Sequence, residues 1–471
     1  MNSTSPYFAL LRYCLGKKRN MSRAIAGMNW QQLYSFASKQ ALLGLCFEGI
    51  ERLGKEYPEE LKQNPIGREL LMTWMGKAQQ IRRQNMKVNA VAGKLFSMLR
   101  EDGLRCCILK GQGNALMYPN PYSRTPGDID VWIDASRERI MEYTQKKFEL
   151  GDDIRLQHLE TSLDSVPVEL HFFPCSMNNP IYHARLQKWF RRNADLQCSH
   201  IVGLPDGAGD IAIPTSPFNV VYQLCHLYHH FFDEGIGMRQ IIDYFLVVND
   251  FSKNVFLDTD FSNHPVNFSN HPVPLSKEGS TAFPKPLSPQ GTGDVTAPSR
   301  CSEPLRSKDG GASKPSPDCA GWDRRGVSGD TNSVSCSSGS SITSVSSAST
   351  TDSSASTALD VVQRELKYLG LWKFAGAVMF VLHEVLGLSE DKMIVPVDEK
   401  RGKLLLAEIL DGGNFGRHFS KYGGFTHQSM GKKYFLKIWR NMHFVRYYPA
   451  EALCEPLFRT WHFFWRLKYK K

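Results

Sequence analysis

Apolar residues in the first hundred positions recur at every third or fourth residue, which is the spacing of one helix face. Leu33, Phe36 and Ala37 begin this pattern, and it continues through residues 42–46. Residues 77–100 extend it as a longer amphipathic segment with basic residues on its polar side. The pattern predicts a helical region over residues 1–100.

The hydrophobic pattern changes after residue 100. Short runs at 105–109, 129–133 and 166–173 are rich in β-branched and aromatic residues and are separated by turn and helix signals. They predict the strands of one α/β unit within residues 101–215.

Helical spacing returns in the second half of the chain, at 219–248 and again at 359–388. We therefore predict one helical domain made of residues 216–250 and 359–471. The whole pattern predicts an α+β fold in which a mixed β-sheet with its helices is flanked by N-terminal and C-terminal helical regions.

The segment between these helical stretches, residues 251–358, is rich in Ser, Thr, Pro and Gly. Such a composition cannot bury enough apolar surface to offset the entropy of ordering, so we predict a disordered insert. It contains a direct repeat, FSNHPVN at 261–267 followed by FSNHPVP at 268–274, which indicates an insertion born of slippage. A loop of this length is tolerated because the entropy of closing it grows slowly with length.

The overall composition is that of an ordinary soluble protein, with 42% hydrophobic and 22% charged residues and a mean hydropathy of −0.34. The longest uncharged apolar run in a helical context, 374–382, is shorter than the roughly 20 residues of a membrane span. The N-terminus lacks the pattern of a secretory signal. The 11 cysteines form no CxxC pair, which favours a reducing compartment. These features predict a cytoplasmic protein without a transmembrane segment.

The formal net charge is +10. The insert is close to neutral, so the excess positive charge belongs to the rest of the chain. A basic surface suits partners that carry phosphate, such as nucleotides or RNA. The alternative is a basic enzyme with no nucleic-acid partner, because charge alone does not define a site.

The most informative stretch for chemistry is GDIDVWID at 127–134. On a strand, Asp128 and Asp130 point to the same face about 6.6 Å apart, while Ile129 and Val131 face the other way into a core. Two adjacent carboxylates are unfavourable unless a cation lies between them. Mg²⁺ is the expected ion, with Mn²⁺ as an alternative, because its ligands are hard oxygen atoms.

A third carboxylate occurs in VPVELH at 166–171, where Val168 and Leu170 alternate with Glu169. If this strand lies next to the first, about 4.8 Å away, Asp128, Asp130 and Glu169 converge on one point. A two-metal site needs such a cluster. The three residues are therefore our predicted metal ligands and catalytic residues.

Residues 108–116, ILKGQGNAL, combine a strand end, a glycine turn and a helix start. Backbone N–H groups at Gly111 would suit a phosphate, and Lys110 could add a cation. Arg124 offers a planar fork for phosphate oxygens. Each feature alone has a simpler interpretation, since glycines end many strands and Arg124 could form a surface ion pair. Their order within one α/β unit favours phosphate binding.

Three histidines, His226, His229 and His230, fall near one face of a predicted helix. The spacing is compatible with zinc, but their aromatic neighbours favour packing and hydrogen bonding in a core. Farther along, Arg239 and Asp243 are spaced to pair across one helical turn.

The C-terminal segment 459–471, RTWHFFWRLKYKK, mixes aromatic residues with cations. It could lie on RNA or on a membrane surface. We favour a last core helix with a basic solvated end.

The combination LKGQGNALMY, RTPGDIDVWID and VPVELH resembles the nucleotidyltransferase superfamily with the DNA polymerase β-like fold. More narrowly, it is similar to the bacterial uncharacterised nucleotidyltransferase family, a relative of the AbiEii-type toxins. GIGMRQIID at 235–243 and DGGNFG at 411–416 are also similar to that family. The resemblance covers most of the chain outside the insert.

This resemblance implies metal-dependent transfer of a nucleoside monophosphate from an NTP such as ATP to an acceptor hydroxyl, with release of pyrophosphate. Asp128, Asp130 and Glu169 would match the metal ligands, and Gly111 the phosphate-facing turn. Many superfamily members carry Gly-Ser at that turn, whereas Lys110 precedes Gly111 here, so the identity of the NTP stays open. The acceptor also stays open among a sugar, another small molecule, a tRNA and a protein.

Two alternatives remain. One is a catalytically inactive regulator of the same fold that binds nucleotides or RNA. The other is a toxin–antitoxin component that modifies tRNA or a partner protein. Neither the oligomeric state nor the role of the insert follows from the sequence.

Overall fold

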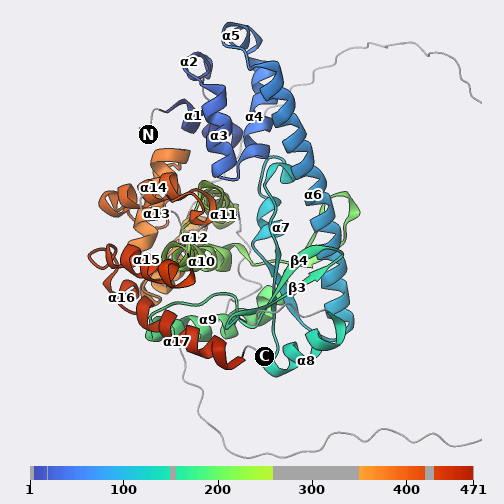
Figure 1. Cartoon of the computed structure of the whole chain (residues 1–471), viewed down its shortest axis with the longest axis vertical. Coiled ribbons are helices and arrows are strands. Elements are labelled where there is room, and N and C mark those ends of the chain that lie inside the picture. The colour runs from blue at the N-terminus through green and yellow to red at the C-terminus, as the bar shows by residue number, and fades with distance from the viewer. Residues whose placement is uncertain (1–4, 18–19, 149–154, 258–348, 420–428, 470–471) are drawn as a thin grey trace, which may run out of the picture. The chain divides into compact units, whose positions relative to one another are not determined.

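The fold is mixed α and β in a computed structural model of the chain (Figure 1). The structure describes residues 5–17, 20–148, 155–257, 349–419 and 429–469. These residues belong to one compact unit. Most of the predicted insert lies outside the described residues, and its predicted disorder with it. Only its two ends are described, and both are helical.

The N-terminal region is helical, as its apolar spacing predicts. Its helices are α1 (Pro6–Cys14), α2 (Ser22–Ala26), α3 (Trp30–Lys39), α4 (Leu43–Glu56), α5 (Pro58–Gln63) and α6 (Arg68–Glu101). The Asn29 side chain caps α3 by accepting a hydrogen bond from the backbone of Gln32. Helix α6 begins earlier than the predicted 77–100, and its C-terminal half packs on the β-sheet through residues such as Val91 and Leu95.

The central sheet has four strands, in the order β1-β2-β4-β3. They are β1 (Cys106–Leu109), β2 (Ile129–Ile133), β3 (His158–Leu163) and β4 (Val166–His171). Strands β2 and β4 are parallel, while β1 and β3 pair antiparallel with their neighbours. The predicted strands are confirmed. Strand β3 escaped prediction because HLETSL lacks an alternating apolar pattern.

The two faces of β2 have different surroundings, as the period of two requires. Ile129, Val131 and Ile133 pack into the core beneath α6. Trp132 points to the other face and stacks on Phe218, with ring centroids 6.3 Å apart. The sheet thus has a helix layer on each side, and Asp130 shares the face of Trp132.

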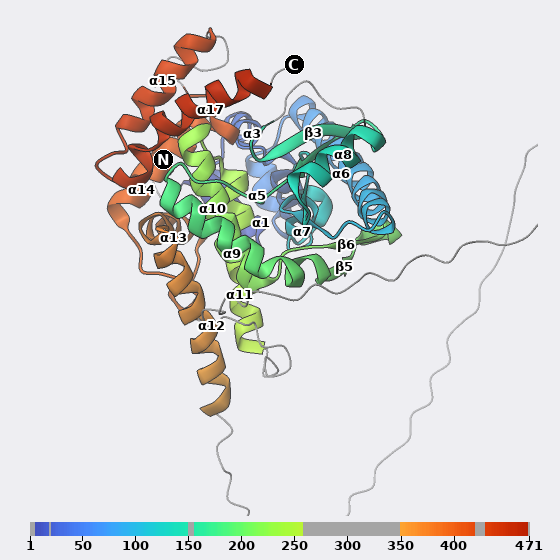
Figure 2. The same cartoon turned by 90° about the horizontal axis from the view of Figure 1, so that it is seen from below.

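The remaining helices are those of the α/β unit, α7 to α9, and those of the second helical region, from α10 onward (Figures 1 and 2). The helices are α7 (Gly111–Ala115), α8 (Arg137–Lys147), α9 (Pro180–Ser199), α10 (Ser216–Asp233), α11 (Met238–Leu257), α12 (Ser349–Tyr368), α13 (Trp372–Leu386), α14 (Glu399–Gly412), α15 (Met430–Met442), α16 (Pro449–Ala452) and α17 (Glu455–Tyr469). Short 3-10 turns include η1 (Pro121–Ser123), η2 (Pro205–Gly207), η4 (Glu390–Lys392) and η5 (Asn414–Gly416), and a separate ribbon pairs β5 (Ile201–Gly203) with β6 (Asp210–Ala212). None of the described helices has the length and apolar character needed to cross a membrane.

Helices α10 and α11 form the centre of the larger apolar core. Their aromatic residues, among them Phe231 and Phe245, are buried against α13, which contributes Phe374. The polar residues of α10 face the sheet instead. This arrangement sets one wall of a cavity opposite the strand ends.

Candidate functional site

A cavity of about 470 Å³ lies between the ends of β2 and β4 and the helices α10 and α15. The strand side contributes acidic residues and histidines, and the helix side contributes further histidines and most of the cations. The lining residues are Lys110, Asp128, Asp130, Arg155, Gln157, His158, Glu169, His171, His226, His229, His230, Asp233, Glu234, Phe415, Gly416, Arg417, Lys433 and Lys437.

The predicted carboxylates meet at one edge of the sheet. Asp130 and Glu169 are directly paired across the parallel strands β2 and β4, and Asp128 lies just before β2. The neighbouring placement of the two strands is thereby confirmed. Asp130 is buried, while Asp128 and Glu169 line the cavity with it.

Two basic side chains hold Asp130 in place. Lys110 Nζ lies 2.8 Å from Asp130 Oδ1, and His171 Nε2 lies 3.0 Å from the same oxygen. His171 Nε2 is also 3.1 Å from Glu169 Oε2, so it bridges the two carboxylates. The side-chain amide of Gln157 approaches His171 Nδ1 at 3.2 Å from the far side of the ring.

The charges of this cluster shift the pKa values of its members in opposite directions. The charge of Asp130, together with burial and Glu169, raises the pKa of Asp128 to about 6. Burial opposes ionisation of Asp130, but Lys110 and His171 outweigh it and hold the pKa of Asp130 well below its usual range. Burial lowers the pKa of His171, but its hydrogen bonds to the two carboxylates raise it to about 9. The pKa values of neighbouring groups in this cluster are thus moved apart by burial and by their mutual charges.

The turn before α7 places Lys110 beside the carboxylates. Lys110 adopts a φ of 52° and Gly111 a φ of 35°, in the region that L-residues with a side chain rarely adopt. Such a conformation at a non-glycine residue persists only when surrounding contacts enforce it, and it is concentrated at functional sites. Here the ion pair with Asp130 and the contact of Lys110 Nζ with His226 Nε2, at 3.1 Å, enforce it.

Arg124 has a partner that the sequence did not indicate. Its Nε and one terminal nitrogen donate to the two oxygens of Asp243 at 2.9 and 2.8 Å, and Tyr118 donates to the same carboxylate at 2.7 Å. The predicted pair of Arg239 with Asp243 is wrong, because Arg239 donates to the carbonyl of Thr125 instead. Arg124, which follows the η1 turn, binds both carboxylate oxygens of Asp243 through two guanidinium nitrogens. Such a bidentate contact suits a carboxylate better than a contact from a neighbour on the same helix.

A small cavity of about 50 Å³ joins this ion pair to the carboxylates. It is lined by Arg124 and Arg239 as well as by Gly111, Asp128 and Asp130. Arg124 thus lies near the site, but Asp243 holds its planar fork. Phosphate contact by Arg124 stays a prediction.

The histidines of α10 line the cavity wall. Burial, followed by the charge of Lys110, lowers the pKa of His226 well below its usual value. Burial, followed by His229, lowers the pKa of His230 to about 3. The rings of His226 and His230 pack edge to face, with centroids 4.3 Å apart. At physiological pH the imidazoles of His226 and His230 are therefore neutral, and His226 Nε2 can accept a hydrogen bond from Lys110. The contact between the two rings also gives them a packing role.

Two further histidines belong to the strand side. Within the described ranges, the one cluster with metal-ligand spacing is His158, Glu169 and His171, whose ligand atoms lie within 4.8 Å of one another. His158 and His171 are paired across β3 and β4. The alternation of Glu169 with His171 could have indicated His171, whereas His158 required knowledge of the unpredicted strand β3.

The opposite wall is basic and comes from distant parts of the sequence. It includes Arg417 after η5 together with Lys433 and Lys437 of α15. Lys437 Nζ is 3.3 Å from an oxygen of Asp233, at the end of α10. Sequence reasoning missed these cations, because no local motif marks them.

Residues 411–416, DGGNFG, form the base of this side of the cavity. Gly416 has a φ of 62°, and a side chain there would collide with the carbonyl oxygen of Glu234, only 1.9 Å from the Cβ position. Glycine is therefore required where η5 meets the end of α10.

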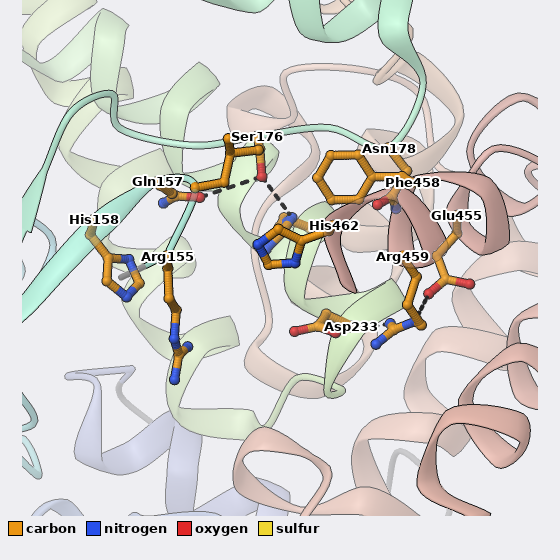
Figure 3. A pocket seen from close by; sticks show the side chains of 12 residues that line it. Arg155, Gln157, His158, Ser176, Asn178, Asp233, Glu455, Phe458, Arg459 and His462 are labelled. Atoms are coloured by element: carbon orange, nitrogen blue, oxygen red, sulfur yellow. Dashed lines mark hydrogen bonds and ion pairs between the residues drawn. The ribbon is translucent and has the colours of Figure 1, made fainter. Parts of the chain in front are cut away.

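A smaller pocket of about 140 Å³ adjoins the main cavity and shares Arg155, Gln157 and His158 with it (Figure 3). Ser176 Oγ contacts Gln157 Oε1 at 3.4 Å, and Figure 3 shows it between the strand residues and α17. Polar groups and the rings of Phe458 and His462 line this pocket, so it suits a small polar ligand with a ring.

The model of the family described as "Uncharacterised nucleotidyltransferase" matches residues 26–261, half of the chain. The chain belongs to this family. As a nucleotidyltransferase, it belongs to a class whose substrates are NTPs and whose members generally use divalent metals. The relation to AbiEii-type toxins stays a prediction.

Among solved structures, the nucleotidyltransferase is similar to an antigenic nucleotidyltransferase-like protein from Paracoccidioides brasiliensis. The identity is 16%, the TM-score is 0.25, and the match covers 34% of this chain and 75% of the other. No curated protein matched the chain.

Proposed function

We propose that this nucleotidyltransferase moves a nucleoside monophosphate from an NTP to an acceptor hydroxyl in the cavity between the strand ends and α15, and releases pyrophosphate. The observation that carries the proposal is the register that pairs Asp130 with Glu169 beside Asp128. A cluster of carboxylates that faces a basic wall is suited to a metal-bound triphosphate.

The donor set fits a divalent cation. Asp128, Asp130 and Glu169 offer hard oxygen ligands, which Mg²⁺ and Mn²⁺ prefer. The raised pKa of Asp128, about 6, arises first from the charge of Asp130, and a bound cation would remove that repulsion. When bound, the ion would neutralise charge on the reacting phosphate and activate the acceptor oxygen.

The chain's own residues would then position the substrate. Lys110 holds Asp130 and presents a cation beside the turn at Gly111, where backbone N–H groups would bind phosphate. Arg417 and Lys433 on the opposite wall would bind the outer phosphates of the NTP. His171 fixes the two carboxylates relative to each other. Arg124, through Asp243, anchors the segment that leads to Asp128 and would reach phosphate only by releasing Asp243.

The acceptor would enter beside the NTP, and the pocket of Figure 3 offers a place for it. A sugar, another small molecule, a tRNA end and a protein hydroxyl all stay candidates. We place the reaction in the cytoplasm, because the eight cysteines among the described residues are free thiols.

The test is Asp130→Asn, compared with Asp164→Asn on the exposed turn after β3. Labelled NTPs, Mg²⁺ and cell lysate are added, and pyrophosphate release and the labelled fraction are measured. We expect Asp130→Asn to lose at least roughly a hundredfold in rate, while Asp164→Asn keeps the wild-type rate. Full transfer by a folded Asp130→Asn protein would refute the proposal.

A second candidate is an inactive nucleotide-binding regulator, favoured by the two cations that already contact Asp130. They balance its charge without a metal. In that case, calorimetry would detect NTP binding, and Mg²⁺ would neither strengthen the binding nor permit pyrophosphate release.

A further inference from the structure

Helix α15 has its polar side turned toward the protein. Arg440 is buried and pairs with Glu408 at 3.1 Å, and Asn441 donates to the carbonyl of Phe232 at 2.8 Å. Lys433 and Lys437 line the cavity. The polar face of this amphipathic helix therefore contacts the protein interior and the cavity.

The apolar side of α15 faces outward. Phe435 is 71% exposed, and Trp439 and Met442, one and two turns later, are about half exposed. A helix on the surface of a globular protein normally has the reverse arrangement, with its apolar stripe on the core. Helix α15 thus has its polar face on the protein and its apolar face toward solvent.

Helix α17 repeats this arrangement. Glu455 is buried and pairs with Arg459, which also contacts Asp233 at 2.9 Å. Leu457 is 73% exposed, and Trp461 follows it on the outer side. The prediction that this segment is a core helix is wrong, because Trp461, Phe463 and Phe464 are at least half exposed. Its predicted basic end, residues 466–471, lies outside the side chains that the structure describes.

The two helices lie side by side (Figure 2). The hydroxyl group of Tyr434 in α15 contacts that of Thr460 in α17. Together with Leu453, between α16 and α17, the two helices expose a set of large apolar side chains that we call the C-terminal aromatic face. Its members are Phe435, Trp439, Met442, Leu453, Leu457, Trp461, Phe463 and Phe464. Each of these side chains is between 47% and 73% exposed, whereas a soluble protein normally exposes large apolar side chains singly.

The same region holds much of the chain's net positive charge. Residues 430–471 contain ten Lys and Arg against two Glu, while the whole chain carries a net charge of +10. Lys433 and Lys437 line the cavity and Arg440 is buried, whereas Lys432 and Arg446 of the same segment are exposed. A surface that combines Trp, Phe and Leu with Lys and Arg matches an interfacial lipid-binding helix.

We propose that the C-terminal aromatic face docks on an anionic phospholipid surface, with α15 and α17 lying in the plane of the interface. The apolar side chains would enter the boundary between headgroups and acyl chains, and the cations would contact the headgroups. This inference does not rest on the proposed function.

Two other occupants fit less well. A two-fold dimer through this face would bring two strongly basic segments together, which like-charge repulsion disfavours. Nucleic acid complements the charge, but its interfaces are polar and would leave Met442, Leu453 and Leu457 without an apolar partner. An anionic lipid surface offers negative headgroups for the positive charges and acyl chains for the aliphatic side chains.

The test is sedimentation of the full chain with vesicles of phosphatidylcholine and phosphatidylglycerol, and with vesicles of phosphatidylcholine alone. We expect binding to the anionic vesicles that weakens as salt is raised. Phe435→Gln combined with Trp461→Gln should reduce it by roughly tenfold or more, since both lose buried apolar area. The melting temperature should stay unchanged because both side chains are exposed.

The matched control is Met72→Gln combined with Met86→Gln, two exposed apolar residues of α6. It should bind vesicles like the wild type. Absence of binding to anionic vesicles, or binding that the aromatic substitutions leave unchanged, would overturn the proposal. Two further results would also overturn it if vesicles do not bind. One is a dimer in sedimentation equilibrium that these substitutions abolish, and the other is a complex with single-stranded RNA that they abolish.

Discussion

The two walls of the cavity are built in contrasting ways. The strand wall takes Asp128, Asp130 and Glu169 from two neighbouring strands, within about 40 residues of one another. The helix wall takes His226 from α10 and Lys433 from α15, which lie far apart in the sequence. The strand wall is acidic and set in a rigid sheet, whereas the helix wall supplies most of the cations. Under the proposed function, the carboxylates of the strand wall would hold the metal, and the cations of the helix wall would bind the outer phosphates of the NTP.

The largest expected effect tests the strand wall. Glu169→Gln should lower kcat by roughly a hundredfold or more, because a metal ligand contributes several kcal/mol to the transition state, while KM for the NTP changes little. Steady-state pyrophosphate release measures both constants. Glu160→Gln is the matched control, since Glu160 is the β3 residue paired with Glu169 and is partly exposed. Equal losses in both variants would contradict a special role for Glu169.

The next effect concerns the anchor that joins η1 to α11. Arg124→Ala would leave Asp243 buried without its charged partner, and we expect a loss of about 3–5 kcal/mol in the free energy of unfolding. Urea denaturation measures it. Adding Asp243→Asn to Arg124→Ala should recover part of the loss. A loss below about 1 kcal/mol would show that Arg124 is not a structural residue, and would favour its predicted phosphate contact.

The helix wall should show a different kinetic signature. Lys433→Ala should raise KM for the NTP by roughly five- to thirtyfold with little change in kcat, because the cation would bind ground state and transition state alike. Lys432→Ala, its exposed neighbour, is the control. A drop in kcat at unchanged KM would break the proposed division between the walls.

The smallest effect tests the contact between α16 and the loop that follows β4. Glu451 of α16 accepts hydrogen bonds from the backbone of Asn178 and Asn179, at 2.5 and 3.2 Å, in the loop that follows β4. Burial raises its pKa to about 7, above the ordinary 4.5. The folded state therefore favours the protonated form, and the associated stability is lost as pH rises from 4.5 through 7.

Melting temperatures across this pH range measure the effect. The wild type should lose stability as the pH rises, and Glu451→Gln should flatten that slope. If the variant keeps the full slope, another group is responsible for it.

Sequence patterns predicted the strand wall because its geometry is local. Alternation along GDIDVWID fixes which side chains share a face, and the same holds for VPVELH. Strand β3 could not be predicted, so His158 was missed. The partner of Asp243 was assigned to the wrong arginine because helical spacing says nothing about residues on other elements.

The sequence by itself determined the α+β pattern, the helical regions and the strand that carries Asp130, because backbone periodicity dictates them. Only the tertiary structure decided that Glu169 lies beside Asp130, that Lys110 and His171 hold that carboxylate, and that cations from α15 face it. It also decided that the apolar sides of α15 and α17 point outward. These contacts join residues that no local spacing relates, so packing alone selects them.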